Sequence, residues 1–180
     1  MNNKIDKILF SEDEIKQKVR ELGAKISDDY KGKEVMLLCI LKGAFVFASD
    51  LLRAIDSDTV SMHFMVASSY GDKTESSGHV IIKQDIEEPV KGKHVIIAED
   101  IIDTGRTLRY VMDYLESKGA ASVEVCALFD KPDRRVINVE AKYRGFLLPD
   151  EFVVGYGLDY AGYYRNLPYL GVLKREVYEN

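Results

Sequence analysis

The sequence predicts an α/β protein with a mostly parallel central sheet and helices on both faces. Two short runs, VMLLCIL at 35–41 and VIIA at 95–98, are apolar at every position, which is typical of central strands covered on both sides. Segments of strand length also alternate along the chain with segments of helical period. That alternation favours parallel strands joined by helices.

The first third of the chain predicts two helices and two strands. Ser11 and Glu14 match the S-x-x-E capping box, which marks the start of a helix. Apolar residues then recur at helical spacing, so an amphipathic helix is expected over residues 11–30. The next elements are expected to be a strand, a helix and a strand, at 35–41, 44–54 and 60–68.

A polar stretch rich in Gly and Ser separates the two halves of the chain. Residues 69–78 have no apolar period, and a loop of this length is often functional. A helix is expected over 107–118, where Gly119 ends the apolar period. The strands expected in this half are 80–85, 95–98, 123–129 and 151–156.

Composition limits the class of protein. A length of 180 residues suits one domain, and a net charge of -5 disfavours general nucleic-acid binding, which depends on neutralised phosphates. No segment reaches the roughly 18 consecutive apolar residues that span a bilayer. The N-terminus has no signal-peptide pattern, so the cytoplasm is the expected location. Cys39 and Cys126 lie in apolar runs and are expected to be buried and reduced.

The strongest candidate site follows the strand at 95–98. Ligands of parallel sheets bind beyond the carboxyl ends of the strands, where this sequence places Glu99, Asp100 and Asp103. A glycine turn, residues 104–107, then leads into a helix. Backbone N–H groups and the helix dipole make such a turn an anion site.

Carboxylates beside an anion site suit a ligand that carries both a phosphate and neighbouring hydroxyls. Glu99 and Asp100 can accept hydrogen bonds from ribose hydroxyls and can help to hold a hydrated Mg²⁺. The alternative for each residue taken alone is a solvated acidic turn followed by a helix cap. The whole string makes that alternative much weaker.

The string EDIIDTGRT resembles the 5-phosphoribosyl-1-pyrophosphate (PRPP) motif of type I phosphoribosyltransferases, in the form of their hypoxanthine-guanine branch. The resemblance implies that Glu99 and Asp100 bind the ribose hydroxyls and Mg²⁺. It makes Asp103 the candidate general base facing N7 of the purine. Arg106 stands at a variable position, which leaves it a backbone role. The residues expected to hold the 5′-phosphate are Asp103, Thr104, Gly105, Arg106 and Thr107.

The resemblance adds a pyrophosphate site and a lid. Leu41, Lys42 and Gly43 would form the pyrophosphate loop, often with a cis peptide bond between the first two residues, and Arg165 would contact the same group. Without the family, 41–43 is a plain strand-to-helix turn. Ser69 and Tyr70 would belong to a lid that excludes water; the alternative is a surface loop.

The resemblance places the purine at the C-terminal half. Lys131 would donate to the 6-oxo group, Phe152 would stack on the ring and Val153 would offer backbone groups to the 2-position. Asp159 would lie beside the purine and help to bind a second Mg²⁺. Taken alone, Lys131 is a solvated turn lysine, Phe152 and Val153 are strand core, and Asp159 is a turn carboxylate.

Taken together, the resemblance implies a single domain over 1–180 with the type I phosphoribosyltransferase fold. A small hood would form from the N-terminal segment and roughly 131–180. The implied activity is Mg²⁺-dependent transfer from PRPP to a 6-oxopurine, without nucleic-acid or membrane partners, in a dimer or tetramer. A xanthine-preferring enzyme and a PRPP-sensing regulator remain the alternatives.

Overall fold

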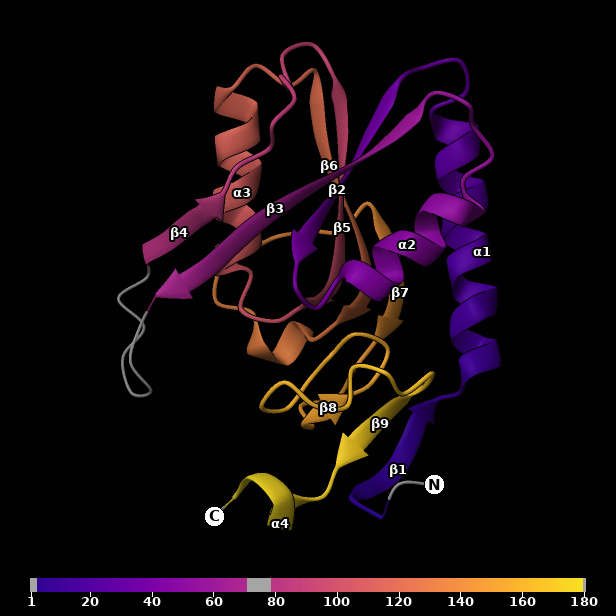
Figure 1. The fold of residues 1–180 in the computed structure, drawn as a ribbon, viewed down its shortest axis with the longest axis vertical. Coiled ribbons are helices and arrows are strands. Elements are labelled where there is room, and N and C mark those ends of the chain that lie inside the picture. Colours follow the sequence, from indigo (N-terminus) through magenta and orange to yellow (C-terminus); the bar gives the residue numbers. More distant parts are fainter. Residues whose placement is uncertain (1–2, 71–78, 180) are drawn as a thin grey trace.

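The computed structural model describes residues 3–70 and 79–179, and its main body is a six-stranded sheet (Figure 1). The strands are β2 (Val35–Leu41), β3 (Val60–Tyr70), β4 (His79–Gln84), β5 (His94–Ile102), β6 (Ser122–Asp130) and β7 (Tyr143–Leu147). Their order is β4-β3-β2-β5-β6-β7, and only β4 within this described sheet is antiparallel to its neighbour. The α/β class with a mostly parallel sheet is therefore confirmed.

Helices cover both faces of this sheet. α1 (Glu12–Asp29) and α2 (Phe45–Ala54) lie on one face, and α3 (Arg106–Ser117) lies on the other (Figure 1). The side chains of β2 alternate between the two cores, since Leu37 packs with the α1–α2 core and Leu38 with the α3 core. The reading of 35–41 as a strand covered on both sides is confirmed.

Helix α1 begins where the capping box predicts. The Ser11 hydroxyl accepts a hydrogen bond from the backbone N–H of Glu14, and the Glu14 carboxylate accepts one from the backbone N–H of Ser11. At the other end of the helix, the Tyr143 hydroxyl on β7 donates to Asp29 at 2.7 Å. These contacts fix α1 against the edge of the sheet.

A second, smaller sheet lies at the carboxyl end of the central strands (Figure 1). It contains β1 (Ile5–Phe10), β9 (Leu170–Leu173) and β8 (Val153–Val154), in the order β1-β9-β8 and antiparallel throughout. A single 3₁₀ turn, η1 (Pro132–Arg134), follows β6, and the short helix α4 (Arg175–Tyr178) follows β9. The two ends of the chain therefore meet beside the end of the sheet that binds ligands in this class of fold.

The structure corrects several element boundaries. The strand predicted at 151–156 forms only at 153–154, and β5 continues four residues beyond Ala98 to Ile102. β1, β7 and β9 were missed, because strands of four to six residues interrupted by charge or glycine carry little local pattern. β3 runs to Tyr70, and the rest of the predicted loop, 71–78, lies outside the described residues. None of the described helices is long and apolar enough to cross a membrane.

Candidate functional site

Two acidic side chains lie near the carboxyl end of β5. Asp100 is buried, and its carboxylate accepts a hydrogen bond from the backbone N–H of Ile101 at 2.8 Å. Burial raises the pKa of Asp100 to about 6, although backbone hydrogen bonds and the charge of Arg165 oppose the rise. Burial and the charge of Asp100 raise the pKa of Glu99 well above its ordinary value. A bound cation or several hydroxyl donors would stabilise the ionised forms of these two carboxylates.

The loop after β2 packs against Asp100. The peptide bond between Leu41 and Lys42 is cis, as the resemblance implied. Gly43 lies so close to β5 that a Cβ atom at this position would sit 1.8 Å from Oδ2 of Asp100. Only glycine fits there, so the backbone of this loop and the buried carboxylate form one surface.

A second loop, residues 155–165, closes on the same place. A Cβ atom at Gly157 would sit 2.2 Å from the carbonyl oxygen of Gly43, so the two loops touch. Arg165 donates to the Gly157 carbonyl at 2.6 Å and pairs with Asp159 at 2.7 Å. The other carboxylate oxygen of Asp159 accepts from the N–H of Gly162 at 2.7 Å. The arginine and Asp159 are therefore held by this loop beside Asp100, whose pKa both of them affect.

Helix α3 starts with an open N-terminus. Its N-cap residue, Gly105, has a φ of +80°, in the region that favours glycine, and no side chain caps the helix. The N–H of Arg106 makes only a long contact, 3.5 Å, with the hydroxyl of Thr104. Backbone N–H groups of the first turn, together with Thr104 and Thr107, thus offer donors to an anion.

The carboxyl end of β6 carries a buried lysine. Lys131 is 8% exposed, and its ammonium donates to the backbone carbonyl of Glu151 at 2.5 Å. Burial lowers the pKa of Lys131, while the negative charges of Asp103 and Asp150 oppose that change. Asp103, at the end of β5, is about half exposed and accepts a hydrogen bond from Nε of Arg134 at 2.8 Å.

The aromatic residue after Glu151 lies at the edge of the small sheet. Phe152 is 38% exposed, with its ring stacked on Tyr178 of α4 at a centroid distance of 4.8 Å. Val153 is buried and pairs with Val172 of β9. A cavity of about 430 Å³ adjoins this edge. Its lining includes Asp150, Glu151, Phe152, Lys174 and Tyr178.

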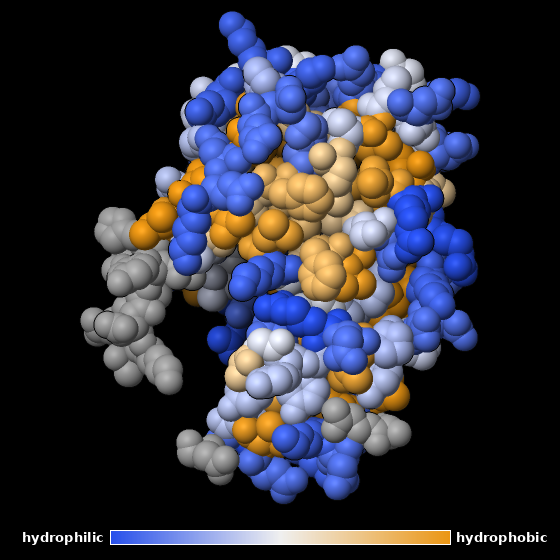
Figure 2. Space-filling view, viewed as in Figure 1, coloured by the Kyte–Doolittle hydropathy of each residue, from blue (hydrophilic) through white to orange (hydrophobic). Residues whose placement is uncertain are grey.

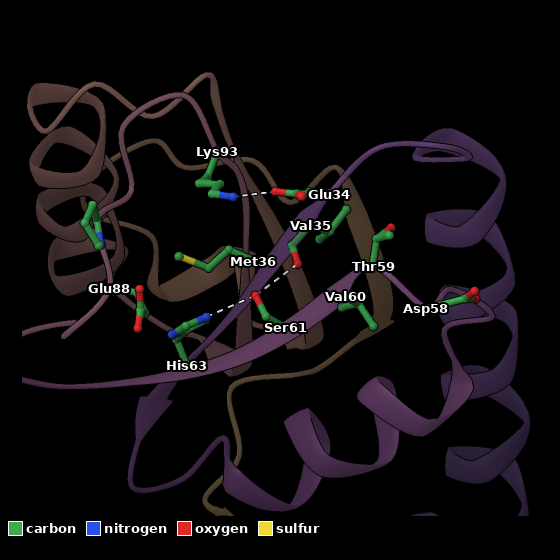
Figure 3. Close-up of a pocket in the computed structure, with 11 residues that line it drawn as sticks. Glu34, Val35, Met36, Asp58, Thr59, Val60, Ser61, His63, Glu88 and Lys93 are labelled. Carbon is green, nitrogen blue, oxygen red and sulfur yellow. Dashed lines mark hydrogen bonds and ion pairs between the residues drawn. The ribbon is translucent and has the colours of Figure 1, made fainter.

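Another cavity, of about 520 Å³, lies at the opposite end of the sheet (Figure 3). Its walls come from the beginnings of β2 and β3, where Lys93 pairs with Glu34 and His63 contacts the Ser61 hydroxyl at 3.0 Å. Because parallel sheets bind ligands at their carboxyl ends, its size alone does not make it the candidate site. The candidate site is therefore the one around the carboxylates of β5.

Comparison with known proteins now bears on this site. Residues 7–161 match the family described as the phosphoribosyl transferase domain. A hypoxanthine-guanine phosphoribosyltransferase of Streptococcus pneumoniae (strain ATCC BAA-255 / R6) is 51% identical over 180 residues, which cover 100% of this chain and 99% of the relative. The chain belongs to the phosphoribosyltransferase family.

Solved structures of this family share the whole fold. A crystal structure of a hypoxanthine phosphoribosyltransferase from Staphylococcus aureus matches with a TM-score of 0.96 at 48% identity, covering 100% of this chain and 97% of that one. A hypoxanthine phosphoribosyl transferase of Trypanosoma cruzi matches with a TM-score of 0.93 at 39% identity, covering 99% and 96%. The type I phosphoribosyltransferase fold is therefore shown.

Residues 103–107 lie at the start of α3, and eight other predicted residues of this phosphoribosyltransferase fall into two groups. One group gathers at the end of β5 and comprises Gly43, Glu99, Asp100, Asp159 and Arg165. The other gathers around Glu151 and comprises Lys131, Phe152 and Val153. The side chain of Lys42 is exposed. The side chains of Ser69 and Tyr70 lie outside the described residues, so the lid stays a prediction.

No sequence pattern indicated a role for Arg134, although its side chain contacts Asp103, the predicted general base. The missed pattern is DKPDRR, residues 130–135, in which two arginines follow the predicted purine lysine. The neighbouring Arg135 pairs with the buried Asp130, which also lies 3.5 Å from Arg144. Tandem arginines after a strand usually indicate a solvated turn, so the pattern alone could not separate these roles.

Proposed function

We propose that the protein transfers the 5-phosphoribosyl group of PRPP to N9 of hypoxanthine or guanine, which gives IMP or GMP and pyrophosphate in purine salvage. One observation carries the proposal. Asp100, a buried carboxylate, lies against the backbone of Gly43 and near Arg165, in the strand that leads to the open N-terminus of α3. Such a site suits a sugar that bears a phosphate at one end and a pyrophosphate at the other. The name of the Streptococcus pneumoniae relative supports the same reaction.

The sugar and its phosphates would occupy the first group of residues. Glu99 and Asp100 accept hydrogen bonds from the 2- and 3-hydroxyls of the ribose. The 5′-phosphate binds the first turn of α3 and the hydroxyls of Thr104 and Thr107, where the helix dipole favours an anion. The loop 41–43 and Arg165 receive the pyrophosphate.

The carboxylates also fit Mg²⁺. The described residues contain no cluster of three or more potential protein ligands for a metal. Mg²⁺ does not need one, since it is commonly held by one or two carboxylates together with substrate phosphates and water. Glu99 and Asp100 are hard oxygen donors whose pKa values are raised mainly by burial, and Asp159 lies close enough to Asp100 for their charges to interact. Bound Mg²⁺ would neutralise the departing pyrophosphate.

The purine would lie between the two groups. Lys131, as a buried cation, donates to the 6-oxo group, and this favours 6-oxopurines because a 6-amino group would leave the lysine unpaired. Phe152 contacts the ring, and the backbone at Val153 faces the 2-position. The carboxylate of Asp159 is engaged by Arg165 and by the backbone N–H of Gly162.

The proposed reaction is a displacement at C1 of the ribose with inversion. N9 of the purine forms the new bond to C1 as the bond from C1 to the pyrophosphate oxygen breaks. Asp103 accepts the proton from N7, and Lys131 holds the purine in position for attack on C1. Ser69 and Tyr70 are proposed to cover the reacting centre and to exclude water.

A base screen tests the proposal. The protein is incubated with PRPP, Mg²⁺ and hypoxanthine, guanine, xanthine, adenine or uracil in turn, and nucleotide formation is followed. We expect IMP and GMP as the main products. The Asp103→Asn variant should lose turnover by about 10²–10³-fold, and this loss should be far larger than any loss of affinity for PRPP. No product from either 6-oxopurine would overturn the function, and near-normal turnover by Asp103→Asn would overturn the base role.

We also propose that the protein is a cytoplasmic homo-oligomer. Apolar side chains gather over α2 and β3 in Figure 2, and Phe45, Phe64 and Ile81 are each at least 45% exposed. An exposed apolar patch of this kind suits a second copy of the chain. Light scattering after size exclusion should give a dimer or tetramer, and Phe64→Lys should shift it toward monomer. Tyr110→Lys, on α3, is the matched control and should not.

A further inference from the structure

Arg134 is fixed between two carboxylates at the purine side of the site. Its Nε donates to Oδ1 of Asp103 at 2.8 Å, and its Nη1 lies 3.4 Å from Oδ1 of Asp150. The charge of Asp103 is the main cause of a raised pKa at Arg134. The guanidinium thus stays charged and spans from the end of β5 to the segment before β8.

The residues after Arg134 are bound to the phosphate loop. The backbone N–H groups of Val136 and Ile137 both donate to the carbonyl of Thr104 at 3.0 Å. The carbonyl of Ile137 lies so close to Gly105 that a Cβ atom there would be 2.5 Å away. We call residues 134–137 the strap. It ties the segment that follows Lys131 to the start of α3.

Among the residues that the structure describes, none forms a hydrogen bond or an ion pair with Oδ2 of Asp103. Lys131 is close enough to Asp103 for their charges to interact, but its ammonium is bonded to the carbonyl of Glu151. Across 3–70 and 79–179, Arg134 is therefore the side chain that bonds directly to Asp103, at Oδ1. Because Oδ1 of the carboxylate is held by Arg134, Oδ2 keeps a fixed direction in which it can accept a proton.

We infer that Arg134 is a positioning residue for Asp103, whose carboxylate it holds oriented toward the purine. The inference rests on the proposed function, because it gives Arg134 a role through the candidate base. The pair is half exposed and contributes little to folding stability. The Arg134–Asp103 pair should instead affect turnover, because a small misplacement of a reacting group lowers the rate strongly.

The test is steady-state kinetics of the whole protein with PRPP, Mg²⁺ and hypoxanthine. Arg134→Gln should lower kcat on the order of tenfold without changing KM for PRPP. Arg134→Lys keeps the charge but not the oriented Nε donor, so it should recover part of the loss. In an Asp103→Asn background, Arg134→Gln should have no further effect, because the partner charge is already gone.

A matched control separates this role from the loss of any surface ion pair. The Arg109 side chain pairs with Asp113 along α3 and makes no hydrogen bond or ion pair with a described residue of the strap, so Arg109→Gln should behave as wild type. The inference is overturned if Arg134→Gln retains wild-type kcat, if its effect persists undiminished with Asp103→Asn, or if Arg109→Gln loses as much. A wild-type protein without turnover of either 6-oxopurine would instead refute the proposed function, and the inference with it.

Discussion

The phosphate side of the site and the base side are built in different ways. On the phosphate side, Glu99 and Asp100 lie on a central strand, and the proposed anion site is the first turn of α3. On the base side, Val153 begins the two-residue strand β8, and Phe152 immediately precedes it. The loop after β8, which carries Asp159 and Arg165 to the group at the end of β5, contains non-glycine residues with positive φ, at Tyr156, Ala161 and Tyr164.

The phosphate side relies mainly on backbone geometry, whereas the base side relies on particular side chains. The proposed recognition of phosphate and ribose would use strand ends and helix N–H groups, which any sequence with that fold positions well. The proposed base recognition would depend on the buried Lys131 and on Phe152, which are held by a hydrogen bond and a ring contact to residues farther along the chain. Substitutions on the phosphate side should therefore lower activity with every acceptor base, whereas substitutions on the base side should lower it to different extents with different bases.

Removal of the divalent cation should have the largest effect. With EDTA, we expect turnover of hypoxanthine and guanine to fall together by about 10³-fold or more, because a metal ion contributes several kcal/mol of charge stabilisation. Added Mg²⁺ should restore both activities. Unequal losses for the two bases would contradict the assignment of the cation to the phosphate side.

Gly43→Ala should be the next most severe change. The new methyl group would displace Asp100, whose Oδ2 lies 1.8 Å from the position of the added Cβ. We expect kcat/KM to fall by about 10²-fold for hypoxanthine and guanine alike. Thermal unfolding should confirm that the variant is folded, and an unchanged kcat/KM would show that loop 41–43 and Asp100 need not touch.

Sequence reasoning reached further on the phosphate side for the same physical reason. A fully apolar strand that runs into EDIIDTG and a helix places its carboxylates and glycine by local geometry, and the structure has them near the end of β5 and at the N-cap of α3. The capping box at Ser11 was likewise local. Lys131, Phe152 and Asp159 were assigned roles only through the family resemblance.

What could not be predicted depends on contacts between distant segments. β1 and β9 form because the two ends of the chain pair with each other, and neither strand has a pattern that predicts this. Arg134 and Asp103 are 31 residues apart in the sequence. No local sequence pattern connects an arginine in a turn with a carboxylate just after a distant strand. This pair could therefore be recognised only in the three-dimensional structure.

Lys131→Gln tests the base side. A hydrogen bond to a charged group contributes about 1.5–3 kcal/mol, so kcat/KM for 6-oxopurines should fall roughly ten- to a hundredfold, with affinity for PRPP unchanged. Burial lowers the pKa of Lys131, so the wild-type protein should lose base affinity as pH rises through a value below the ordinary lysine range. The Gln variant should lack this dependence. KM for hypoxanthine measured against pH, in both proteins, checks the prediction.

Tyr178→Ala should give the smallest effect, and one confined to the base. The Tyr178 ring stacks on Phe152 at 4.8 Å with an interplanar angle of 23°, and so supports the aromatic residue that is proposed to contact the purine. Such pairs contribute about 0.5–1.5 kcal/mol, which corresponds to a roughly two- to tenfold rise in KM for hypoxanthine. Tyr178→Phe keeps the ring and should retain the wild-type value. If Tyr178→Ala raised KM for PRPP instead, α4 would serve the phosphate side, and the two regions would not be separable in the way their construction implies.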